Sequence, residues 1–197
     1  MIGKFKPALI VCLAVMLAMV MLMPMTASAS AGVTKVKATR TKGATEQMVV
    51  KGLTSSNKVV WKYTSEKYSA TELTRTFCKV RGKKVYVFDG TTLRIISKAT
   101  GKRLHTVKNL TMAGHAVGFD KKGNIYVTGY YDTVLYKVSA KGRLVWKSDY
   151  QSTGKYWAYN VKATSSRVTV ICDANESHPG EAGPYKVVFS ASKGTVL

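Results

Sequence analysis

The sequence predicts an all-β protein built from tandem units of four antiparallel strands. Short runs of β-branched and aromatic residues alternate with polar residues at period two, which is typical of strands. Turn residues, above all glycine beside lysine or asparagine, separate these runs. The same order of runs and turns recurs along the chain about every 40–43 residues.

The clearest unit spans residues 113–148. Gly123 and Asn124 tolerate the positive φ angles of tight hairpins, so residues 120–124 are predicted to turn between two strands. A second turn is predicted around Gly142. The strands expected in this unit are residues 117–119, 125–128, 133–138 and 144–147.

Similar units are predicted on both sides of this one. In the preceding unit the expected strands are residues 74–80, 84–89, 92–97 and 104–107. The following unit begins near Tyr159, turns last at Gly194, and has strands expected at residues 167–172 and 185–189. Its longer spacing locates an insertion at residues 173–184. Four short strands in each repeat of about 42 residues are typical of β-propeller blades.

The number of blades leaves two arrangements open. The chain has room for four blades at most, about three to four, and it stops where the fourth strand of the last one should begin. Either a strand at residues 47–50 or 59–63 completes the last blade and closes a small ring, or the chain is a truncated piece of a longer propeller. An open arc would leave unpaired strand edges, so a homo-oligomer is expected in that case.

The N-terminal residues 1–31 have the pattern of a secretory signal peptide. Lys4 and Lys6 precede an apolar run at residues 8–23, and small residues at 27–31 form a cleavage site. An uncleaved transmembrane anchor is the alternative. We therefore expect an exported protein of the cell envelope, with a basic N-terminal arm or a weak first strand at residues 32–45 and the propeller repeats at residues 46–197.

Basic residues greatly outnumber acidic ones. The formal net charge is +21, and removal of residues 1–31 would take away only two lysines. Such a charge attracts polyanions, so we expect a protein or an anionic envelope polymer as partner, no nucleic acid, and contact with a membrane only through an uncleaved signal. A basic surface without a partner is the alternative. The residues concerned are Lys35, Lys37, Arg40, Lys42, Lys79, Arg81, Lys83, Lys84, Lys98, Lys102, Arg103, Lys121, Lys122, Lys141 and Arg143.

No catalytic, cofactor-binding or metal-binding residue is assigned, and no cofactor is predicted. The sequence lacks nucleophile elbows, metalloprotease motifs, phosphate-binding glycine loops and C-x-x-C pairs. The acidic residues 173–181 fall in the insertion, where Pro and Gly indicate a solvated loop rather than a cation site. His105 and His115 each stand alone and are expected to be packed or partly exposed side chains rather than ligands. Cys78 and Cys172 fall in different blades and are expected to remain free thiols, although export permits a disulfide.

Two short motifs resemble known propeller repeats. Residues 100–105 and 141–146 are similar to the T-G-x-x-x-W end of pyrroloquinoline-quinone-like repeats, with His105 in place of tryptophan in the first copy. Residues 119–129 resemble the D-x-x-G-N-x-Y-V-T-G pattern of the bacterial NHL and SBBP repeats. The resemblance covers residues 47–197 and implies a propeller in which a tryptophan docks one blade on the next.

The resemblance specifies an architecture more than an activity. We favour a non-catalytic exported propeller that serves as a binding or scaffold module. The alternatives are a fragment or relative of a quinone-dependent dehydrogenase, or a small NHL-repeat lyase.

Overall fold

The computed structural model describes residues 32–69, 76–110, 113–129, 134–149, 156–174 and 184–197. The chain divides into two units, Met1–Gly32 and Val33–Leu197, and every described strand belongs to the second. The predicted signal peptide and most of the predicted insertion lie outside the described residues. No helix long and apolar enough to cross a membrane occurs in the described part of the chain.

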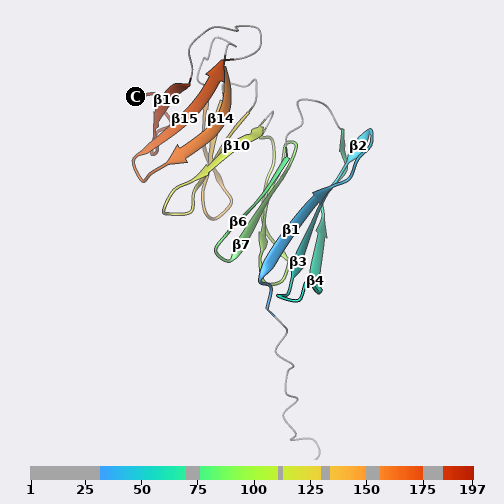
Figure 1. Ribbon diagram of the computed structural model, residues 1–197. Coiled ribbons are helices and arrows are strands. Elements are labelled where there is room, and N and C mark those ends of the chain that lie inside the picture. The colour runs from blue at the N-terminus through green and yellow to red at the C-terminus, as the bar shows by residue number, and fades with distance from the viewer. Residues whose placement is uncertain (1–31, 70–75, 111–112, 130–133, 150–155, 175–183) are drawn as a thin grey trace, which may run out of the picture. The chain divides into compact units, whose positions relative to one another are not determined.

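The described strands form four main antiparallel sheets, which confirms the all-β fold class (Figure 1). The first sheet consists of β1 (Lys35–Arg40), β3 (Met48–Leu53) and β4 (Val59–Thr64). The second consists of β6 (Thr76–Arg81), β7 (Lys84–Asp89), β8 (Leu93–Ser97) and β9 (Arg103–Val107). The third consists of β10 (Ala113–Phe119), β11 (Ile125–Gly129), β12 (Val134–Val138) and β13 (Leu144–Asp149). The fourth consists of β14 (Tyr156–Ala163), β15 (Arg167–Ala174) and β16 (Tyr185–Ser190).

Two of these sheets are complete four-stranded meanders, in which each strand pairs with its neighbour in sequence. That topology is the one expected of propeller blades. Val196 bridges Phe189 and so begins a fourth strand on the last sheet. A short ribbon of β2 (Thr45–Glu46) and β5 (Tyr68–Ser69) accompanies the first sheet.

The first sheet decides between the alternatives left open for the N-terminal residues. Residues 32–45 do not form an arm, because β1 pairs along its whole length with β3, from Lys35 opposite Leu53 to Arg40 opposite Met48. Both strands considered for closing the ring, at residues 47–50 and 59–63, instead pair with each other within this sheet. No pairing among the described strands closes a ring.

The apolar core lies between successive sheets. Val50 and Trp61 of the first sheet pack with Val85 and Ile96 of the second. Two further clusters join the second sheet to the third and the third to the fourth. The second and third sheets are therefore covered on both faces, which explains why β7 and β11 are buried almost throughout rather than at alternate residues.

A side-chain ring from each of the first three sheets packs against a turn glycine of the following sheet. Trp61 lies against Gly101 and Trp146 against Gly194, so closely that an added Cβ would come within 2.7 Å and 2.8 Å of the rings. Trp61 Nε1 donates to the Lys98 carbonyl at 2.9 Å, and Trp146 Nε1 donates to the Ala191 carbonyl at 3.3 Å. The docking that the resemblance implied is thus present.

His105 takes the same place between the second and third sheets, where its Cβ and ring cover Gly142. The turn that carries Gly142 is one residue shorter than the turn that carries Gly101. The Ser139 N–H donates to the Arg143 carbonyl, whereas the Ser97 N–H donates to the Lys102 carbonyl. His105 is thus partly buried against this turn, in agreement with the prediction of a packed or partly exposed side chain. Lys84 strengthens this joint by donating from Nζ to the Ala140 carbonyl at 2.6 Å.

The corresponding turn of the first sheet is different. Asn57 has a φ of 65°, close to the 68° of Gly101 and the 73° of Gly142. It also stands at the same distance in sequence before Trp61 as Gly142 does before Trp146. Asn57 carries a Cβ, and its Oδ1 accepts a hydrogen bond from Lys35 Nζ at 3.3 Å. The first sheet therefore lacks the open glycine surface on which a ring from another sheet would dock.

We expect Trp61→Ala to lower the free energy of unfolding by about 3–5 kcal/mol, because it empties a buried site and removes the bond to Lys98. Val60→Ala is the control, since Val60 is the neighbouring residue and is 41% exposed. Urea denaturation of both variants measures the difference. Equal losses in the two variants would mean that the docked ring does not hold the sheets together.

Candidate functional site

The turns between strands one and two and between strands three and four of the sheets lie at one end of the strands. In a meander the turn between strands one and two and the turn between strands three and four fall on the same side. Hydrogen bonds between sheets align these turns: Arg81 donates to the Asp120 carbonyl at 2.6 Å, and Lys137 donates to that of Ala191 at 2.5 Å. We call this side the turn end and the opposite side the loop end.

Basic side chains gather at the turn end. Asp120 is the sole acidic residue in its described turns, and its carboxylate accepts from Asn124 and from the Tyr126 hydroxyl. Burial acts to raise the pKa of Asp120, but the hydrogen bonds from Asn124 and Tyr126 outweigh it and hold that pKa below its usual value. The basic residues of the turn end are Lys35, Lys58, Arg81, Lys83, Lys84, Lys98, Lys102, Lys121, Lys122, Lys141, Arg143, Arg167 and Lys193.

The ion pairs of the described residues all lie at the loop end. Arg40 pairs with Glu46 at 3.0 Å, and Lys147 pairs with Asp149 at 3.4 Å. Arg94 pairs with both Glu66 and Asp89. Positive charge at the loop end is therefore partly neutralised, whereas at the turn end it is not.

Some of the predicted surface charges have a structural role instead. Lys35, Arg81 and Lys84 donate to backbone carbonyls, and Arg81 also covers the Phe119 ring at 5.2 Å. Others are exposed and have no hydrogen-bond or ion-pair partner for the side chain among the described residues: Lys83, Lys102, Lys121, Lys122, Lys141, Arg143 and Lys193. These side chains are available to a ligand.

A second basic surface lies on the outer face of the first sheet. Lys37, Lys51 and Lys62 are directly opposite one another on β1, β3 and β4. Their neighbours Met48 and Val50 point into the core, so the lysines point away from it. Like charges opposite each other disfavour the sheet unless an anion neutralises them. Sequence reasoning singled out Lys37 but missed Lys51 and Lys62, although their alternation with buried residues places them on this face.

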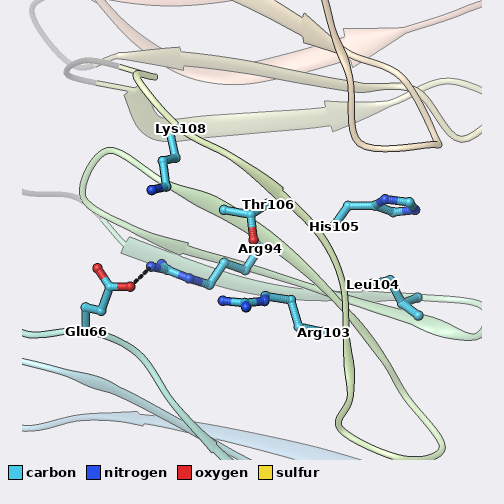
Figure 2. A pocket seen from close by; sticks show the side chains of 7 residues that line it. All are labelled: Glu66, Arg94, Arg103, Leu104, His105, Thr106 and Lys108. Carbon is cyan, nitrogen blue, oxygen red and sulfur yellow. Dashed lines mark ion pairs between the residues drawn. The ribbon is translucent and has the colours of Figure 1, made fainter.

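A cavity of about 330 Å³ lies beside β9 and the residues that follow β4 (Figure 2). Its lining residues are Glu66, Arg94, Arg103, Leu104, His105, Thr106 and Lys108. The Arg94 side chain is 4% exposed and bonds to Asp89, which is equally buried. Burial raises the pKa of Asp89 to about 6, against the opposing effect of Arg94. Arg103, expected at a turn surface, lines this cavity instead.

The two cysteines among the described residues are free, as expected. Cys78 lies in β6 and Cys172 in β15, and burial raises the pKa of both thiols to about 11. Such thiols are not activated nucleophiles. No group of three metal-ligating side chains occurs among the described residues, and the acidic segment 175–181 lies outside them. The side chain of His115 is outside the described part as well.

Comparisons with known proteins add the following. No protein-family model matches the chain, and no curated protein is similar to it. It is similar to a solved protein of unknown function from Bacteroides caccae, with a TM-score of 0.44, 12% identity and coverage of 81% of this chain and 58% of that one. It is also similar to the β-propeller domain of Myceliophteria thermophila Cps50 (Swd1), with a TM-score of 0.49, 11% identity and coverage of 72% and 51%. The chain spans just over half the length of these structures, and the pyrroloquinoline-quinone, NHL or SBBP assignment stays a prediction.

We expect the stability of the protein to fall as the pH rises from 4 to 6. The pKa of Asp89 is about 6 in the folded protein and 3.8 ordinarily, so the folded state binds this proton more tightly. The resulting stabilisation is complete below pH 3.8 and is lost as the pH rises through 6, by at most about 3 kcal/mol. Asp89→Asn should lack this decrease and Asp149→Asn should keep it, in urea denaturation at several pH values. The same pH dependence in all three proteins would contradict the assignment.

Proposed function

We propose that the protein is an exported, non-catalytic propeller-type module that binds an anionic polymer of the cell envelope. The observation that carries the proposal is the separation of charge along the strands. Exposed lysines and arginines without acidic partners occupy the turn end, whereas the described ion pairs occupy the loop end.

A linear polyanion suits this surface better than a small ligand. The exposed lysines belong to turns of the second, third and fourth sheets, so they are spread over a wide area rather than gathered around one point. Charges of one sign within about 8–10 Å of each other reinforce their potential at physiological salt. A polymer that bridges several of them releases its counterions, which is a favourable contribution to binding.

The N-terminal sequence supports an envelope ligand over an intracellular one. If residues 1–31 direct export, the polyanions that the protein meets are wall or lipid-surface phosphates and acidic polysaccharides. The lyase alternative needs a catalytic histidine, and of the two candidates, His105 and His115, the first is already used in docking the third sheet. No feature of the described residues favours the dehydrogenase alternative.

We expect binding of poly(glycerol phosphate) to weaken with salt and to depend on the turn end. The triple variant Lys121→Gln, Lys122→Gln, Lys141→Gln should lower the affinity about tenfold at low salt. It should also reduce the slope of log K against log salt by about 2, because each lysine contributes roughly 0.7 to that slope. Fluorescence anisotropy with labelled polymer over a range of salt concentrations measures both quantities.

The matched control is Lys42→Gln, Lys67→Gln, Lys186→Gln, which removes the same charge from exposed lysines at the loop end. It should change the affinity less than threefold. Equal losses in the two triple variants would show that net charge alone attracts the polymer. Absence of binding by the unsubstituted protein would refute the proposal.

A further inference from the structure

We propose that the cavity beside β9 is a separate binding site for one phosphate monoester group, in which Glu66 occupies the place of the ligand while the site is empty. The site is distinct from the turn end, because it is a cavity with a buried floor rather than an open surface. The proposal stands whether or not the protein binds a polymer.

Arg94 supplies the floor of the cavity. Its side chain is 4% exposed, and Nη1 is bonded to the buried carboxylate of Asp89, which holds the guanidinium in place. Nη2 faces Glu66 Oε1 at 3.0 Å, and the Glu66 side chain is 83% exposed. The inner ion pair is fixed by burial, whereas the outer one is made to a carboxylate in water and is weak. An anion from solution can therefore replace Glu66 on Arg94.

Arg103 and Lys108 provide the remaining positive charge. Figure 2 shows the Arg103 guanidinium extending to the same side as that of Arg94, with Lys108 also lining the cavity. Neither side chain has a hydrogen-bond or ion-pair partner among the described residues. Thr106 adds a hydroxyl to the lining.

The balance of charge selects a dianion. Asp89 neutralises Arg94, so displacement of Glu66 leaves the charges of Arg103 and Lys108 uncompensated. A phosphate monoester is close to doubly charged above its second pKa of about 6. Its oxygens also match the forked donors of a guanidinium, which binds phosphate through two parallel hydrogen bonds. The volume of about 330 Å³ is ample for such a group.

Titration calorimetry with glycerol 3-phosphate at pH 7.5 tests the proposal. Glu66→Gln should tighten binding about two- to fivefold, because it removes the internal competitor. Asp149→Asn makes the same change of charge at an exposed carboxylate elsewhere and should leave the affinity unchanged. Arg103→Gln should weaken binding at least about tenfold, since a charged hydrogen bond is lost. Equal effects of Glu66→Gln and Asp149→Asn, or no saturable binding by the unsubstituted protein, would overturn the assignment.

A second arm with inorganic phosphate separates an ester from the free anion as the source. A clear preference for glycerol 3-phosphate supports the monoester, whereas equal or tighter binding of inorganic phosphate would replace it with the free anion. The turn-end triple variant should bind glycerol 3-phosphate as the unsubstituted protein does. Loss of this binding in that variant would mean that the two surfaces are one site and would contradict the proposal.

Discussion

Each main sheet is connected to the next by one side-chain ring that packs against a turn glycine of the next sheet. The glycine meets two requirements together, since its φ is positive and any Cβ would overlap the ring of Trp61, His105 or Trp146. The ring in turn aligns the turn with the preceding sheet, and the tryptophans add a hydrogen bond to a turn carbonyl. The apolar clusters between sheets depend on this alignment. Asn57 ends the series at the first sheet, because it has the backbone conformation of the glycine but not its open surface.

The charge pattern follows from the same topology. Because successive meanders dock turn against turn, lysines that are far apart in sequence come to one end of the strands. Two of the basic residues there, Arg81 and Lys84, stabilise the docking by donating to turn carbonyls of the next sheet. The acidic residues mostly follow strands at the other end, where they pair with arginine and lysine. Basic residues that hold the sheets together and exposed basic residues without partners among the described residues thus share one surface.

The pair of Arg94 and Asp89 is of a different kind. It is buried close to the joint between the first and second sheets, and its outer contact is a single exposed carboxylate. Burial of an ion pair contributes little to stability, because desolvation offsets the attraction. A preorganised guanidinium at the floor of a cavity is instead the arrangement that binds an anion with a defined geometry.

The sequence by itself determined the strands and turns of the repeat. Runs of β-branched and aromatic residues between turn glycines predicted β7 at its observed bounds, and β8, β11 and β15 to within two residues, because these strands depend on local backbone and side-chain preferences. It also indicated the docking tryptophans and the free cysteines. Tertiary structure alone decided that residues 32–45 contribute a strand, since β1 has few large apolar residues and forms by pairing with β3. Strand register, which only the tertiary structure shows, places Lys37, Lys51 and Lys62 in one row. The approach of separate segments of the chain likewise brings Arg94 into contact with Glu66.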